Sequence, residues 1–196
     1  MVDAGLTYTS HYERLNPENA RKTFEYCKDM GLEFVITDPT RVASGPGSID
    51  FYEKLAEEYG VKIALTNHPR PAPYWNPDLV LEDCKGRSKW IGGSADLGHF
   101  MRGGYAPLDV VKKYADAGRM YQFHFRDVSK LGRDGVDVPL GEGAADIRAV
   151  LAEIHRHKIK PLFQFEYETH FDKPMLNLVP SVKFFNDVCG ELLAKE

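Results

Sequence analysis

Three features are scarce in this 196-residue sequence: cysteine, long apolar runs and an excess of positive charge. The three cysteines, Cys27, Cys84 and Cys189, are an odd number at spacings that match no zinc or redox motif, so we expect a reduced, cytoplasmic protein. No run approaches the roughly 18 apolar residues of a membrane span, and the first twenty residues lack the pattern of a secretory leader. We therefore expect no membrane partner.

Positive charge is too sparse and too scattered for nucleic-acid binding. There are 25 Lys and Arg residues against 29 Asp and Glu residues, which gives a net charge of −4. A nucleic-acid binder concentrates basic residues in patches or stripes instead. The rest of the composition is that of a folded protein, with 43% hydrophobic and 12% aromatic residues. We expect one domain over residues 1–196 that binds a small polar ligand and no nucleic acid.

Six short β-branched or aromatic runs alternate with helical patterns along the chain. The expected strands are residues 6–9, 33–37, 62–66, 90–95, 121–125 and 162–166. The expected helices are residues 17–30, 49–59, 77–83, 107–117, 145–157 and 178–194, with Asn16 capping the first one and Gly31 and Gly60 ending the first two. This alternation predicts βα units and a parallel sheet. Eight units of about 28 residues would need about 224 residues, so the six units predict an open or incomplete barrel.

Polar side chains gather just after these strands, where parallel α/β folds bind ligands. Asp96, His124 and Glu166 follow three different strands. Two carboxylates and one imidazole suit Mn²⁺, Mg²⁺, Co²⁺ or Zn²⁺. A metal held in this way can polarise a hydroxy-ketone while a carboxylate or histidine moves a proton. The alternative for each residue alone is a cap or a structural hydrogen bond.

Other residues near the strand ends are candidates for contacts with substrate. His68, His99 and Arg102 could bind substrate hydroxyls or an anionic group, and the alternatives are loop-capping histidines and a solvated arginine. The turn at residues 141–143 has two glycines whose amides could cradle a phosphate, but a plain turn is the better interpretation. Trp75, in a proline-rich loop, could form a wall for a sugar or pack over the barrel mouth.

Five segments resemble the sugar phosphate isomerase/epimerase family of xylose isomerase-like TIM barrels. They are residues 62–69 (KIALTNHP), 95–104 (ADLGHFMRGG), 124–128 (HFRDV), 138–143 (VPLGEG) and 165–168 (FEYE). The resemblance implies a divalent metal at the C-terminal mouth of the barrel, held by Asp96, His124 and Glu166. It also implies a 1,2-proton transfer on a ketose or related sugar, with Glu166 doubling as base and with His99 and Arg102 facing the substrate.

Two features depart from the pattern of that family. Thr66 stands where such proteins place Glu or His, and His68, on the same face of an extended chain, is the alternative ligand. The six units correspond to the last six of eight, which predicts an α/β barrel of the TIM type that lacks its first two βα units. A strand edge near Leu6 would then be unpaired, which favours homo-oligomers.

We predict from these residues a metal-dependent isomerase or epimerase that acts on a sugar or sugar phosphate by proton transfer next to a carbonyl. No cofactor other than the divalent metal is expected. Two other interpretations stay open. One is a metal-dependent hydrolase or lyase on the same scaffold, and the other is a degenerate barrel that binds sugar without catalysis.

Overall fold

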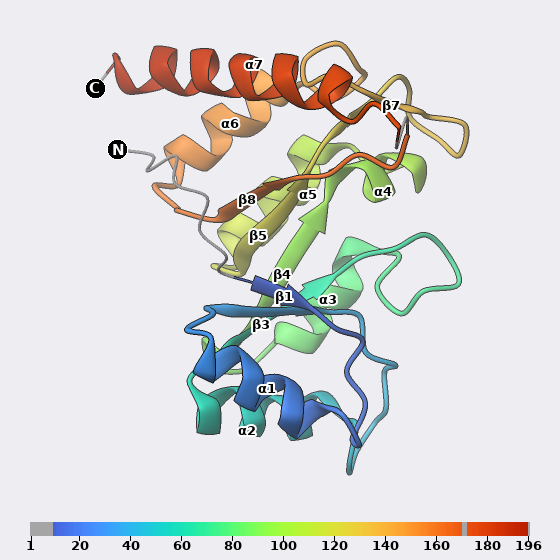
Figure 1. Ribbon diagram of the computed structural model, residues 1–196, viewed down its shortest axis with the longest axis vertical. Coiled ribbons are helices and arrows are strands. Elements are labelled where there is room, and N and C mark those ends of the chain that lie inside the picture. The colour runs from blue at the N-terminus through green and yellow to red at the C-terminus, as the bar shows by residue number, and fades with distance from the viewer. Residues whose placement is uncertain (1–9, 170–171, 196) are drawn as a thin grey trace.

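The computed structural model describes residues 10–169 and 172–195, which form a curled parallel sheet covered by helices (Figure 1). The strands lie in the order β1 (Ser10–Tyr12), β2 (Phe34–Thr37), β3 (Lys62–Thr66), β4 (Ile91–Asp96), β5 (Met120–Phe125) and β8 (Leu162–Phe165). Each neighbouring pair is parallel. A separate antiparallel pair joins β6 (Asp127–Val128) to β7 (Asp137–Val138). The predicted partial barrel is confirmed, and five of its six described strands overlap predicted ones. The strand predicted over residues 6–9 lies outside the described residues, and β1 follows it at Ser10–Tyr12.

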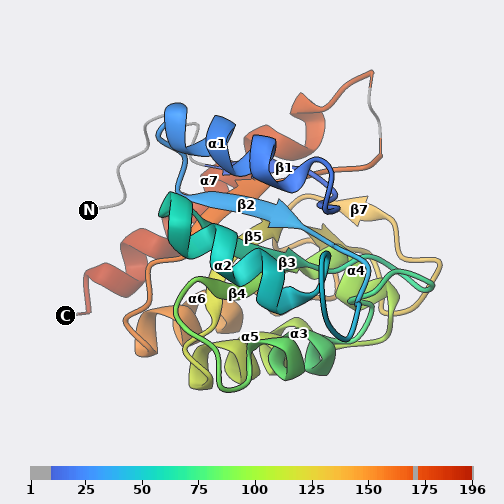
Figure 2. The same cartoon turned by 90° about the horizontal axis from the view of Figure 1, so that it is seen from below.

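Seven helices follow the described strands: α1 (Ala20–Asp29), α2 (Ile49–Tyr59), α3 (Pro77–Cys84), α4 (Leu97–Arg102), α5 (Pro107–Asp116), α6 (Ile147–Arg156) and α7 (Met175–Leu193). Helices that are successive in the chain pack side by side, α1 on α2, α5 on α6 and α6 on α7. Figure 2 shows these helices arranged around the outside of the curled sheet. None of the described helices is long and apolar enough to cross a membrane.

The core lies on both faces of the sheet, because buried parallel strands are apolar on both sides. Val35 belongs to the large cluster between sheet and helices, whereas its neighbour Phe34 belongs to a small cluster on the other face. At the β8 end of the sheet, the Phe163 ring lies 5.3 Å from Phe123 of β5 and 4.9 Å from Phe185 of α7. This aromatic contact holds the last strand and the last helix against the rest of the core.

Two predictions of local structure are wrong for identifiable reasons. The first helix begins at Ala20 rather than at Pro17, because the Asn16 side chain accepts hydrogen bonds from the amides of Glu18 (2.9 Å) and Asn19 (3.0 Å) and so caps a turn before the helix. The α4 helix was not predicted, since six residues are too few to show a helical period. The glycine that ends α2 is confirmed, with Gly60 in the left-handed region at φ 70°.

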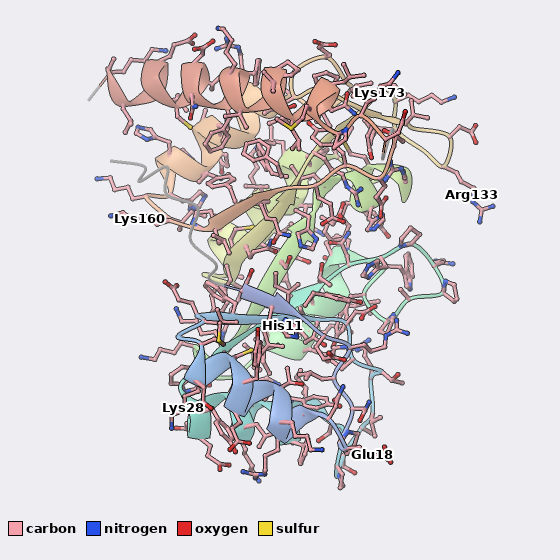
Figure 3. All side chains as sticks on the ribbon, viewed as in Figure 1. His11, Glu18, Lys28, Arg133, Lys160 and Lys173 are labelled. Carbon is pink, nitrogen blue, oxygen red and sulfur yellow. The ribbon has the colours of Figure 1, made fainter. Side chains whose placement is uncertain are left out.

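All strands of the main sheet run in the same direction, so their C-terminal ends meet at one rim. In Figure 3, Lys160, just before β8, lies at the left of the molecule, and Arg133, in the loop between β6 and β7, lies at the right. The segments that follow the strands therefore gather on the Arg133 side. The residues predicted to carry chemistry lie in these segments.

Candidate metal centre

Asp96 ends β4, a strand whose six residues are all buried. A Cβ atom on Gly93 would lie 2.6 Å from the ring of Tyr114, so glycine lets α5 pack directly on this strand. Asn67 fixes the end of the strand from the neighbouring β3 side. Its side-chain oxygen accepts from the Asp96 amide at 2.8 Å and its side-chain nitrogen donates to the Asp96 carbonyl at 3.0 Å. The main chain of Asp96 is thus held on both sides.

The three predicted metal ligands converge at the rim. One ligand atom from each of Asp96, His124 and Glu166 lies within 4.8 Å of the other two. His124 Nδ1 is 3.1 Å from Glu166 Oε2 and 3.7 Å from Asp96 Oδ2. Ligand atoms about 2.0–2.2 Å from one metal ion lie roughly 3–4 Å from each other. The residues therefore fit a divalent ion, and they are the one such group in the described part of the chain.

Thr66 differs in chemistry from the three predicted metal ligands. Its hydroxyl is buried without a hydrogen-bond partner among the described residues, and a neutral hydroxyl is a poor ligand for these ions. His68, the alternative ligand, is not part of this group, and its Nδ1 faces the Asp38 carboxylate, with 3.2 Å between Nδ1 and Oδ2. Three protein ligands are the number that catalytic zinc sites use while leaving room for water or substrate.

Arg126 donates hydrogen bonds to both oxygens of the Asp96 carboxylate. Its guanidinium is fully buried, donates from Nε to Asp96 Oδ1 at 2.9 Å and donates from Nη2 to Oδ2. Burial raises the pKa of Asp96, but the charge and the hydrogen bonds of Arg126 lower it well below its usual range. Asp96 therefore stays ionised, as a ligand must. Gly98 is required here, because a Cβ on it would lie 2.5 Å from Arg126 Nε.

Arg102 contacts protein groups at the same rim. Its Nε donates to the carbonyl of Gly135 at 3.0 Å, its Nη1 donates to Glu168 Oε2 at 3.2 Å, and its Nη2 donates to Asp137. Glu168 also lies 2.8 Å from Arg126 Nη1 through its Oε2 atom. Arg102 and Arg126 are thereby tied to one carboxylate, and direct contact of Arg102 with a substrate stays a prediction.

The two other predicted histidines lie beside the three ligands. His99 Nε2 is 3.7 Å from Asp96 Oδ2 and 3.5 Å from Glu168 Oε1, and burial lowers the pKa of its imidazole. The rings of His68 and His99 are 5.1 Å apart between centroids. The structure thus brings all six predicted residues to one rim, although it does not itself test their roles.

Asp38 lies at the same rim, and no role was predicted for it from the sequence. It follows β2, is 1% exposed and accepts hydrogen bonds from the Tyr12 hydroxyl at 3.1 Å and from Arg14 Nη2 at 2.8 Å. Its position directly after a buried strand was visible in the sequence, but its partner His68 lies in another βα unit. Arg126 was also given no role, although it lies two residues after His124 and two-residue spacing places side chains on one face of a strand.

Two neighbouring features are structural. The amides of Gly141 and Gly143 donate to Asp127 Oδ2 at 3.1 and 3.0 Å, so a protein carboxylate fills this turn and the plain-turn interpretation is confirmed. Trp75 borders a surface hollow of about 590 Å³ beyond β3, but the guanidinium of Arg70 lies 3.4 Å from the centroid of its ring. Arg70 therefore covers one face of the indole, and contact of Trp75 with a sugar stays a prediction.

Comparison with known proteins identifies the family. The pattern of the xylose isomerase-like TIM barrels matches residues 10–187. The chain belongs to this family. Among solved structures, a D-tagatose 3-epimerase-like protein matches with a TM-score of 0.73 and 19% identity, over 95% of this chain and 78% of that one. An L-ribulose 3-epimerase matches with a TM-score of 0.66 and 15% identity, over 91% and 68%.

Two further solved structures with other names share this fold. The IOLI protein, solved with a binding zinc atom, matches with a TM-score of 0.61 and 20% identity, over 91% of this chain and 69% of that one. A probable 3-DHS dehydratase from Bacillus anthracis matches with a TM-score of 0.69 and 15% identity, over 90% and 74%. No curated protein sequence matches this chain. At these identities the structural likeness establishes the fold.

Proposed function

We propose that this chain is a metal-dependent sugar isomerase or epimerase that transfers a proton next to a carbonyl group. The observation that carries the proposal is the convergence of Asp96, His124 and Glu166 at the rim of the sheet. The sugar 3-epimerases and the zinc-bound IOLI protein among the structural neighbours support it. The substrate class that fits is a ketose or a ketose phosphate.

A divalent ion on the three ligands would polarise the carbonyl of the sugar and so acidify the neighbouring C–H bond. Glu166 is the proposed base, because its side chain is 33% exposed at the end of the edge strand β8 and can reach a substrate. Asp96 is less suited to move protons, since Arg126 occupies both of its oxygens and keeps it ionised. We assign His68, His99 and Arg102 to the substrate side of the rim.

Metal content gives the direct test of the ligand set. Elemental analysis of gently purified protein should find about one Mn, Mg, Co or Zn ion per chain. Glu166→Gln should weaken metal binding by more than the roughly 10- to 100-fold that is typical for residues that only support a ligand. Glu142→Gln is the matched control, because Glu142 is an exposed residue of the turn and lies outside the ligand group. Absence of metal, or equal affinity in the Glu166 variant, contradicts the proposal.

A second candidate is a lyase or hydrolase on the same ligands, and the probable dehydratase among the structural neighbours supports it. A panel of ketoses and ketose phosphates in D₂O separates the candidates. An isomeric product carrying deuterium from the solvent supports proton transfer, whereas a dehydrated or cleaved product supports the lyase or hydrolase. Saturable sugar binding without turnover in the presence of any of the four metals supports a barrel that only binds sugar.

A further inference from the structure

A second Asp–His pair lies next to the three proposed ligands and is not used by the chemistry described so far. Asp38 is buried, and its Oδ2 lies 3.2 Å from Nδ1 of His68. Tyr12 and Arg14 donate to the same carboxylate, so its position is fixed from the β1 side. With Nδ1 facing Asp38, the atom of His68 left to meet a substrate is Nε2, and the His68 side chain is 37% exposed.

In the order of the sheet, His68 lies on one side of Asp96 and His124, and Glu166 lies on the other side. His68 follows β3, Asp96 and His124 come from β4 and β5, and Glu166 follows β8. Since β4 and β5 lie between β3 and β8 in the sheet, His68 and Glu166 flank the ligands Asp96 and His124. A substrate bound over those two ligands would have one titratable group on each side.

The surroundings of His68 favour its charged form. The groups that face it are Asp38 from the end of β2, Asp96 from β4, Glu166 from the end of β8, His99 from α4 and Tyr12 from β1. The Asp38 carboxylate, 3.2 Å from Nδ1, is the main influence and raises the pKa of His68, while burial acts the other way. An imidazolium beside a buried carboxylate is a suitable proton donor near neutral pH.

We propose that His68 is the acid that returns a proton to the substrate while Glu166 removes one, and that Asp38 is its positioning residue. The inference rests on the proposed function, whose substrate class it leaves unchanged. It assigns the second proton-transfer group of an epimerisation, for which one base on one side of the sugar is not sufficient.

The step balances without a further reactant. The Glu166 carboxylate takes the proton from the carbon next to the carbonyl, and the electron pair of that C–H bond forms the C=C bond of an enediolate. The same carbon then takes the proton from His68 Nε2 on the opposite face, which inverts its configuration and restores the carbonyl. Glu166 ends protonated and His68 ends neutral, and exchange of protons with water resets both groups.

The chain offers matched controls for both residues. Asp83 has the same kinds of partner as Asp38, since it accepts from the Tyr74 hydroxyl at 2.9 Å and from Arg41 Nε at 2.9 Å, but it lies on α3 and faces no ligand of the metal centre. Asp83→Asn therefore controls for loss of an arginine- and tyrosine-bound carboxylate. His155→Gln, on α6, controls for loss of a histidine elsewhere.

The experiment measures kcat against pH for the metal-loaded protein with the sugar that it converts. His68→Gln should lower kcat by about 10²–10⁴-fold, as expected for loss of a general acid, and His155→Gln should leave it unchanged. Because His68 acts in its protonated form, kcat should fall as pH rises through its pKa. Asp38→Asn should move this fall to lower pH, and Asp83→Asn should not.

A readout independent of turnover is the NMR titration of the His68 ring in protein loaded with Mg²⁺. The His68 signals, identified by their loss in His68→Gln, should titrate at higher pH in the wild type than in Asp38→Asn. Equal titration in the two proteins, or a kcat of His68→Gln within tenfold of the wild type, overturns the assignment while the proposed function stands. If the wild type converts no sugar and binds no divalent metal, the proposed function fails and the His68 assignment fails with it.

Discussion

Two sides of the rim each carry an aspartate, a histidine and an arginine, but their arginines differ in solvent exposure. The β4–β5 side, formed by Asp96, His124 and Arg126, has a guanidinium that is 0% exposed. The β2–β3 side, formed by Asp38, His68 and Arg14, has a guanidinium that is 63% exposed, although Asp38 itself is as buried as Asp96. Each aspartate accepts from one arginine, and Asp38 lies near His68 while Asp96 lies near both His99 and His124. Comparing the two sides separates the effect of burying the carboxylate, which both sides share, from the effect of burying its arginine, which only the β4–β5 side does.

The physical difference is the cost of leaving a charge without its partner. A buried guanidinium or carboxylate that loses its partner stays desolvated and uncompensated, whereas an exposed one is solvated by water. We therefore expect the β4–β5 side to hold Asp96 and His124 rigidly. The β2–β3 side is open to water at Arg14 and His68, so under the proposed function it could exchange protons with solvent.

The largest effect should come from replacing the buried arginine of the β4–β5 side, with the exposed arginine of the β2–β3 side as its control. Arg126→Met leaves Asp96 and Glu168 without their buried cation and should lower the free energy of unfolding by about 3–5 kcal/mol. Arg14→Met should lower it by about 0–1 kcal/mol, because its partner contact is open to solvent. Urea unfolding of both variants gives the measurement. Similar losses in the two proteins would remove the distinction between the two sides.

An intermediate effect should come from the glycine that lies against Arg126. Gly98→Ala places a methyl group 2.5 Å from Arg126 Nε and should destabilise the protein by about 1–3 kcal/mol. Gly190→Ala, in α7, meets no atom within 4 Å and should instead stabilise the helix by about 0.5–1 kcal/mol. A lower melting temperature for Gly98→Ala and a higher one for Gly190→Ala would confirm the close packing at Arg126. A neutral Gly98→Ala would show that the arginine can move.

The smallest effect concerns the pH dependence of the β2–β3 side. Because the folded-state pKa of His68 is raised, its pairing with Asp38 contributes stability that is fully present below the unfolded pKa of about 6.5 and is lost as pH rises through the folded pKa. The stability difference between wild type and His68→Gln should be about 0–1 kcal/mol near pH 5.5 and smaller near pH 9. Urea unfolding at both pH values checks this. A difference that grows with pH contradicts it.

Much of the fold could be predicted because the strands and helices follow strong local patterns. The buried run at residues 62–66 and the helix from Ile49 to Tyr59 coincide with β3 and α2 as observed. The start of α1 could not be predicted, since the Asn16 side chain was compatible with capping either a turn or a helix. The short α4 was missed because its capping residue, Asp96, is also the last residue of β4.

The part of the candidate site that lies at the ends of strands could be predicted from the sequence. Asp96, His124 and Glu166 follow strands, and strand ends of a parallel sheet meet at one rim, so their convergence follows from the topology. The pairing of Asp38 with His68 could not be predicted, because it depends on the loops after β2 and β3 rather than on the strands. The burial of Arg126 depends in the same way on α4, whose Gly98 makes room for the guanidinium.

The amide of Asn67 continues the pairing of β3 with β4 by one side-chain rung after the main-chain pairing of the two strands ends. The main chain of Asp96 is thereby held before the proline-rich segment that follows His68 begins. We expect changes in the length of that segment to leave Asp96 in place, because the Asn67 hydrogen bonds precede it along the chain.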